Sequence, residues 1–172
     1  PGQKRVYDLK TSGECWLFTV NNLGQLVARQ GNNVITLCDS DVVKVAAIRG
    51  WKNISIPSHD HGLVCAYIKT DGNLYYRNYA EQINGSVVWE PERLITEIPL
   101  PVVDVSLFRC NDYRTGIVIQ DNVGKIHWLI TSRNWAGMAI APQLITVAPC
   151  EVAINFIPLD YVNSYEEEYL SV

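Results

Sequence analysis

Two hydrophobic patterns take turns along this chain. Segments in which apolar and polar residues alternate, such as "NLGQLVAR" (22–29) and "TDGNLYYR" (70–77), contain a turn with Asn, Asp or Gly. Near-continuous apolar runs, "VVKVAAI" from Val42 and "VVDVSLF" from Val102, stand between them. Alternation is typical of a half-buried β-strand, and a short apolar run bounded by turn signals is typical of a strand buried on both faces. With no convincing amphipathic helix, the pattern predicts an all-β fold.

The strand pattern repeats about every fifty residues. A turn glycine followed by an apolar strand recurs at Gly24, Gly72 and Gly124, with separations of 48 and 52 residues. A short apolar strand follows each hairpin: "VITL" (34–37), "LIT" (94–96) and "LIT" (144–146). An apolar run closes each unit: "DVVKVAAIR" from Asp41, "PVVDVSLFR" from Pro101 and "CEVAINFIP" from Cys150. Each unit therefore reads as four strands: an apolar strand, a hairpin and a short outer strand.

Four strands per unit at this period are typical of the four-stranded antiparallel blades of a β-propeller, and a β-sandwich is the main alternative. We expect a propeller-like repeat domain over 1–162, with units at about 5–40, 41–100 and 101–149 and a trailing strand at 150–162. Residues 163–172, which carry three successive glutamates, are expected to be a C-terminal tail or a linker. Because about three and a half units rarely close a ring, a longer chain or several copies would complete it.

Composition limits the possible partners. The chain has 172 residues, 48% of them apolar and 19% charged, with a formal net charge of -4. This balance lacks the basic excess that nucleic-acid backbones require. No apolar run approaches the roughly 18 to 20 residues of a membrane span, and no signal peptide opens the chain. We expect a soluble domain with neither nucleic acid nor membrane as partner. The first residue, Pro1, and the single methionine, Met138, suggest a piece of a longer protein.

Cysteine and histidine spacing gives little sign of a metal site. The five cysteines contain no C-x-x-C pair and are odd in number, which argues against a disulfide framework and a structural zinc site and favours buried free thiols. Such thiols suit synthesis in a reducing compartment. His59 and His61 in "PSHDHG" lack a third ligand at a recognised spacing, and His127 is expected to be half-buried beside Trp128. We expect no metal and no cofactor.

The units differ most between the hairpin and the outer strand. The second unit carries an insertion at 78–93 and the third at 130–143, and each contains a tryptophan with an arginine nearby. Flat aromatic rings can cover the apolar face of a sugar while polar groups bind its hydroxyls. The candidate ligand-binding residues are therefore Tyr76, Arg77, Trp89, Arg133 and Trp135. The alternative is that these aromatic residues only fill gaps between blades.

Catalysis has weaker support. A glycoside hydrolase needs two carboxylates at one pocket, and the sequence cannot show which acidic residues converge. Asp71 precedes a turn glycine and Asp121 lies near one, where aspartate is favoured for backbone reasons alone. No nucleophile elbow and no phosphate loop is present in the sequence. We expect no enzymatic activity and no catalytic residue, with a glycan-cleaving hydrolase as a remaining alternative.

Three stretches carry a resemblance to a known family. They are "GLVCAYIKTDGNLYYRNY", "VVDVSLFR" with the following "TGIVIQDNVGKIHW", and "INFIPLDYVNSYEEEYL". They resemble propeller-type modules of bacteriophage tail, baseplate and fibre proteins, over most of the chain. The resemblance implies a virion component made in a bacterial cytoplasm. It also implies recognition of host carbohydrate or wall polymer, or a structural role among tail proteins and copies of the chain. It carries over no site residue.

Overall fold

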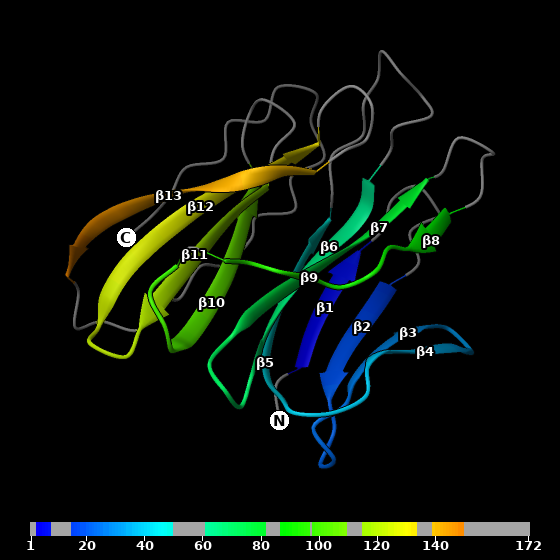
Figure 1. Ribbon diagram of the computed structural model, residues 1–172. Coiled ribbons are helices and arrows are strands. Elements are labelled where there is room, and N and C mark those ends of the chain that lie inside the picture. Colours follow the sequence, from blue (N-terminus) through cyan, green and yellow to red (C-terminus); the bar gives the residue numbers. More distant parts are fainter. Residues whose placement is uncertain are drawn as a thin grey trace.

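The computed structural model describes residues 3–7, 15–49, 61–81, 87–96, 98–109, 115–133 and 139–149. Within these ranges the chain forms strands and turns without a helix, which confirms the all-β prediction. The strands make three open antiparallel sheets that follow one another along the chain (Figure 1). Each sheet contains one of the recurring glycine turns.

Within each sheet, successive strands of the chain lie side by side. The first sheet has the order β1 (Gln3–Tyr7), β2 (Cys15–Val20), β3 (Leu26–Gln30) and β4 (Asn33–Cys38). The second has β5 (Val42–Arg49), β6 (His61–Lys69), β7 (Leu74–Glu81) and β8 (Val87–Trp89), with β9 (Arg93–Leu94) also paired to β7. The third has β10 (Val102–Arg109), β11 (Thr115–Asp121), β12 (Lys125–Arg133) and β13 (Ala139–Pro149). Antiparallel neighbours need only short connections.

Two apolar cores separate the three sheets. The first core, between the first and second sheets, includes Trp16, Phe18, Leu26, Val45, Cys65 and Tyr67. The second core, between the second and third sheets, includes Ala66, Leu74, Tyr76, Leu107, Ile117 and Leu129. Every sheet therefore buries at least one face, and the second sheet buries both.

Strand β5 explains the unbroken apolar run in the sequence. Four consecutive residues from Val45 to Ile48 are at most 7% exposed. Val45 and Ala47 belong to the first core, whereas Ala46 and Ile48 belong to the second. Because successive side chains of a strand point to opposite faces, a strand packed on both sides needs apolar residues at every position.

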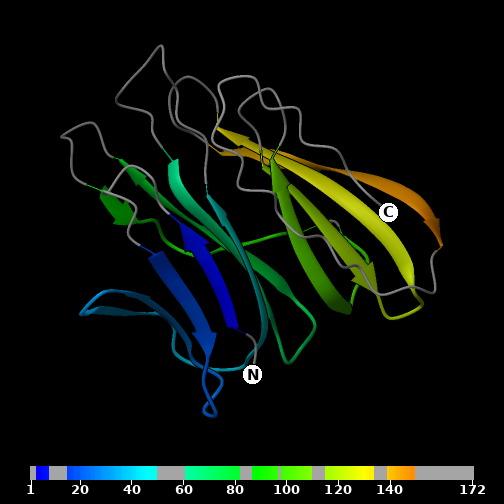
Figure 2. The same ribbon diagram turned by 180° about the vertical axis from the view of Figure 1, so that it is seen from behind.

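The sheets fan out from their first strands. β5 approaches β1 and β2, and β10 approaches β5 and β6. The outer strands β4 and β13 lie at opposite sides of the molecule in both views (Figures 1 and 2). The second sheet lies between the other two, which places β7 and β8 beside the first sheet.

A main-chain hydrogen bond ties each glycine turn to the sheet that follows. The amide of Val42 donates to the carbonyl oxygen of Gly24 at 2.9 Å, and the amide of Val102 donates to that of Gly72 at 3.0 Å. Gly72 has a φ of 79°, and a Cβ there would lie 2.2 Å from the Cβ of Pro101. Only glycine meets both the turn conformation and the close approach of the next sheet.

The second and third hairpins extend further than the first. β3 ends at Gln30, six residues after its turn glycine, whereas β7 and β12 end nine residues after theirs. At roughly 3.3 Å per residue, the extra length is about 10 Å. The segments expected to be insertions, 78–93 and 130–143, are therefore largely hairpin strand in the described part of the chain, which leaves out 82–86 and 134–138. The three glycine turns lie at the opposite end (Figure 1).

Candidate functional site

Strand β7 carries two of the predicted binding residues, and its alternation decides which way they point. Tyr76 is 5% exposed and belongs to the second core, together with Leu74. Tyr75 and Tyr79 are half-buried and pack against the first core. Tyr76 is therefore a core residue with almost no surface for a ligand, and the side of β7 that faces the first sheet carries Tyr75, Arg77 and Tyr79.

Arg77 joins two sheets. Its Nε donates to the carbonyl oxygen of Glu90 at 2.7 Å, and its Nη1 donates to the carbonyl oxygen of Leu37 on β4. The amide of Glu90 donates to the carbonyl oxygen of Asn78 at 2.8 Å, so the segment after β8 is held on β7 as well. A guanidinium suits this position because its several donors lie in one plane and can reach two acceptors at once. The predicted ligand residue thus acts as a tie between β7, β4 and the segment after β8.

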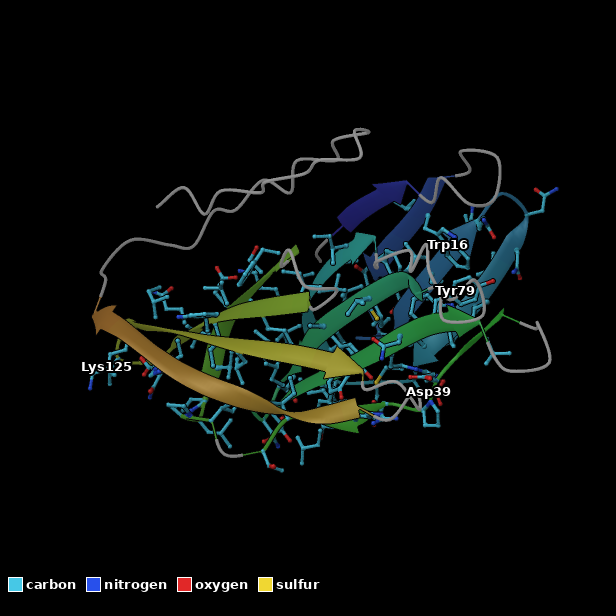
Figure 3. All side chains as sticks on the ribbon, turned by 90° about the horizontal axis from the view of Figure 1, so that it is seen from above. Trp16, Asp39, Tyr79 and Lys125 are labelled. Carbon is cyan, nitrogen blue, oxygen red and sulfur yellow. The ribbon has the colours of Figure 1, made fainter. Side chains whose placement is uncertain are left out.

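Trp89 packs into an aromatic cluster between the first two sheets. Its ring lies 5.9 Å from that of Trp16, 5.8 Å from that of Phe18 and 5.1 Å from that of Tyr79. Trp16 and Tyr79 themselves approach to 5.1 Å (Figure 3). Aromatic pairs at such distances stabilise packing beyond the area that they bury. Trp89 therefore fills the space between two sheets. This agrees with the alternative stated above, in which the aromatic residues fill gaps and do not bind a ligand.

The other two predicted residues belong to the third hairpin. Arg133 is the last residue of β12, and only its backbone is described. Trp135 lies outside the described residues. The end of β12 lies at the end of the molecule to which β7 also extends (Figure 1).

Next to Arg77, a polar cluster unites residues that the sequence did not single out. The hydroxyl of Tyr67 donates to Oε2 of Glu92, and Nζ of Lys69 lies 3.2 Å from Oε1 of the same carboxylate. Lys69 also sits 4.2 Å above the ring of Tyr75, which stacks on Tyr67 with 5.8 Å between centroids. We call Tyr67, Lys69, Tyr75 and Glu92 the seam cluster. Sequence reasoning missed it because Tyr67 and Glu92 are 25 residues apart.

The charges of the seam cluster are fixed near neutral pH. Burial, and then the hydrogen bond to Glu92, raise the pKa of the Tyr67 hydroxyl far above its ordinary value. Burial alone would raise the pKa of Glu92, but the hydrogen bonds from Tyr67 and Lys69 outweigh it and the pKa is lowered. Burial would lower the pKa of Lys69, but its bond to Glu92 raises it. A general acid or base works best with a pKa near the working pH, and these shifts move all three groups away from neutrality.

A buried polar pair lies in the third sheet. Oδ2 of Asp121 is 2.8 Å from Nε2 of His127, and these residues are only 4% and 3% exposed. Oδ1 of Asp121 accepts the amides of Val123 and Lys125 at 3.0 and 2.8 Å. Asn21 accepts two amides in the same way in the first sheet. Asp121 therefore shapes a turn, as its place before Gly124 predicted, and His127 is more deeply buried than expected.

Other predicted features concern metals, thiols and membranes. Among the described residues, no three His, Cys, Asp or Glu side chains converge on a possible metal site. Cys38 and Cys65 are free thiols, and Cys65 is buried. The part of the chain that the structure describes contains no helix long and apolar enough to cross a membrane.

Comparisons with known proteins found no matching family model, no matching curated protein and no matching solved structure. The functional argument therefore rests on the geometry of this chain.

Proposed function

We propose that this chain is a propeller-type binding module of a phage tail or tail-like protein, and that it recognises a host cell-surface glycan or wall polymer. One observation carries the proposal: the hairpins β7–β8 and β12–β13 both extend beyond the β3–β4 hairpin at the same end of the stacked sheets. A rigid sheet scaffold that projects two neighbouring hairpins is suited to binding at their ends.

The arrangement of the sheets supports propeller blades over a sandwich. A sandwich encloses one core between two sheets, whereas two cores here separate three consecutive sheets. Each sheet follows chain order from the first strand outward, and the sheets meet through their first strands. Blades around an axis share both features. Copies of the same chain or other tail proteins would supply further blades.

The fixed charges of the seam cluster favour binding over catalysis. Glu92 and Lys69 form an ion pair, and Tyr67 remains protonated as a donor to Glu92. The cluster therefore stabilises the junction of the first two sheets and places the β7–β8 hairpin. Arg77 and Trp89 act in the same way, as positioning residues that hold this hairpin against the first sheet. We assign direct ligand contact to Arg133 and Trp135 in the third hairpin.

Glycan-array binding tests this proposal, followed by sedimentation with purified cell-wall polymer. We expect the wild type to bind, and Trp135→Ala and Arg133→Ala to lose most binding without a change in the unfolding midpoint. Val123→Ala is the matched control, because Val123 is 70% exposed in the turn at the other end of β12. Binding that survives both hairpin substitutions, or that is lost equally in Val123→Ala, would contradict the assignment.

A second function, contact with another tail protein, is favoured by the opposite end of the molecule. Leu23 and Val123 occupy the same position in two glycine turns and are 76% and 70% exposed. Val43 and Val103 correspond in the first strands and are 51% and 49% exposed. Repeated apolar exposure at one end is typical of interaction sites. If this contact is the main function, substituting Leu23 and Val123 by serine will abolish incorporation into tail particles and leave glycan binding unchanged.

A further inference from the structure

The glycine turns and the corners between sheets form one continuous surface, opposite the end at which the second and third hairpins project (Figure 1). The first strands of the second and third sheets hydrogen-bond to the preceding glycine turns. The amide of Thr70 donates to the carbonyl oxygen of Asp41 at 2.8 Å, and the β10–β11 ladder pairs Val102 with Asp121. Each corner therefore adjoins the turn on either side of it. We call this surface the turn ridge; it comprises residues 21–25, 39–43, 69–73, 99–103 and 121–125.

Aliphatic side chains project from the turn ridge into solvent. Eight large apolar side chains are exposed in the described part of the chain, and five of them belong to this ridge. They are Leu23 (76% exposed), Val43 (51%), Leu100 (53%), Val103 (49%) and Val123 (70%). Scattered apolar residues are normal on a protein surface, whereas a concentration of them on one surface indicates an interaction site.

The turns and corners do not require these aliphatic residues. Leu23 and Val123 directly precede the turn glycines of the first and third sheets, and the second sheet forms the same turn with Asp71 at that position. Val43 and Val103 lie at bulges, where they have no partner in the strand ladder. A polar side chain would fit each of these exposed positions, so packing within the chain does not explain their apolar character.

The middle of the turn ridge is acidic. Asp39, Asp41 and Asp71 are exposed, and none of them forms an ion pair within the part of the chain that the structure describes. Two lysines, one in the second turn and one after the first bulge, each pair with a different carboxylate. Lys125 is exposed at the third-sheet end, far from Asp39 (Figure 3). Negative charge therefore lies between the aliphatic side chains of the first and third turns.

We propose that the turn ridge binds a segment of another protein in which aliphatic side chains flank two or more basic residues. The basic residues pair with Asp41 and Asp71, and the aliphatic ones cover Leu23 and Val123. A second copy that used the same ridge would bring these carboxylates together, and like charges across an interface disfavour a complex. The inference rests on the second function proposed above, contact with another tail protein, and specifies the chemistry of that contact.

Titration of the full chain with two synthetic helical peptides tests this chemistry. Stacked sheets lie roughly 10 Å apart, so the ridge spans about 20 Å, the length of about fourteen helical residues. Both peptides carry leucine on one face; the other positions are lysine in one peptide and glutamate in the other. We expect the lysine peptide to shift the amide NMR signals of the turn ridge, with weaker binding at high salt. The glutamate peptide should leave these signals unchanged.

Two double variants separate the apolar from the charged contribution. Leu23→Ser with Val123→Ser, and Asp41→Asn with Asp71→Asn, should each weaken binding of the lysine peptide by about tenfold or more. Asparagine tolerates the φ of 67° at position 41 and keeps an acceptor for the turn at position 71. Val34→Ser is the matched control and should bind as the wild type does, because Val34 is 50% exposed on β4 away from the ridge.

Several outcomes would overturn the proposal. They are equal binding of the two peptides, signal changes confined to other surfaces, and full binding by both double variants. Changes at the ridge that follow protein concentration alone would assign it to a second copy. Changes caused by phosphatidylcholine vesicles and not by the lysine peptide would assign it to a lipid surface. Glycan binding and incorporation into tail particles are measured separately, so the peptide chemistry can fail while either proposed function holds.

Discussion

Lys44 and Asp104 occupy the same position in the first strands of neighbouring sheets, and their side chains form an ion pair with 2.7 Å between Nζ and Oδ1. Both follow a bulge, between Val42 and Lys44 in β5 and between Val102 and Asp104 in β10. The bulge occurs at the same position in both repeats. Lys44 and Asp104 therefore come together because the second and third sheets stack on each other.

The Lys44–Asp104 pair is expected to contribute little to stability. The side chain of Lys44 is 42% exposed, and exposed pairs typically contribute about 0–1 kcal/mol. A double-mutant cycle with Lys44→Ala and Asp104→Ala, followed by urea denaturation, will measure the coupling. The charge-swapped variant Lys44→Asp with Asp104→Lys should recover the wild-type midpoint. A coupling energy well above this range would mean that the pair is better shielded from water than its exposure indicates.

Substitution of the turn glycine should be costly where the next sheet approaches it. Gly72→Ala places a Cβ 2.2 Å from Pro101, whereas Gly31, with a φ of 55°, has no atom within 4 Å of its expected Cβ. Both variants carry the strain of a positive φ, about 1–2 kcal/mol. We expect Gly72→Ala to exceed Gly31→Ala in loss of unfolding free energy, measured by urea denaturation. Equal losses would show that the turn can move away from Pro101.

Arg77→Lys should loosen the contact between the first two sheets. Lysine cannot reach the carbonyl oxygens of Leu37 and Glu90 together, and a lost hydrogen bond to a charged donor costs about 1.5–3 kcal/mol. Arg29→Lys is the matched control, since Arg29 holds the same position in the first sheet and is exposed. Hydrogen exchange in β4 should rise only in Arg77→Lys. If hydrogen exchange in β4 is unchanged in Arg77→Lys, Arg77 does not hold β4 against the second sheet.

Acid should weaken the third sheet through Asp121. Burial would raise the pKa of Asp121, but hydrogen bonds from His127 and from the amides of Lys125 and Val123 lower it below its ordinary 3.8. A lowered pKa in the folded state means that this stabilisation is complete above pH 3.8 and is lost as pH falls through the folded value. Asp121→Asn keeps an acceptor for the turn and removes the charge. The difference in urea midpoint between wild type and variant should therefore shrink as pH falls below about 4.

The thiol of Cys65 should resist modification in the folded protein. Burial raises its pKa to about 12, although the nearby Arg77 acts in the opposite direction. Because the thiolate is the reactive form, alkylation at pH 8 should modify Cys65 only when the chain unfolds. Peptide mapping by mass spectrometry after pulses of iodoacetamide, with and without urea, will show this. Rapid labelling of Cys65 without urea would contradict the packing of the first core.

The repeat made much of the fold predictable from sequence. Turn glycines give a strong local signal, because a positive φ disfavours other residues, and Gly24, Gly72 and Gly124 marked the hairpins correctly. Apolar runs predicted strands buried on two faces. β5 confirms this from Val45 to Ile48, whereas β10 buries Val102, Val105 and Leu107 and leaves Val103 49% exposed. Each of these signals lies within a short segment of the chain, so it can be recognised in one sequence without knowledge of the fold.

The roles of the candidate site residues were harder to predict. Alternation shows that Tyr75 and Tyr76 point in opposite directions, but it does not show which face of β7 meets which sheet. Arg77 and Trp89 each have a partner in the first sheet, Leu37 and Trp16, about forty to seventy residues earlier in the chain. The contact between Tyr67 and Glu92 likewise depends on how the outer strand breaks between β8 and β9. Such long-range contacts leave no periodic trace in the sequence.

The hydrogen bonds from Val42 to Gly24 and from Val102 to Gly72 suit assembly in the order of the chain. The strands β5 and β10 each begin on a turn that belongs to the preceding sheet, so their first hydrogen bond is made only when that turn is formed. Synthesis delivers the hairpins in this order, and domains generally fold from the N-terminus as they emerge. The chain can thus grow one sheet at a time, with each finished hairpin serving as the template on which the next sheet starts.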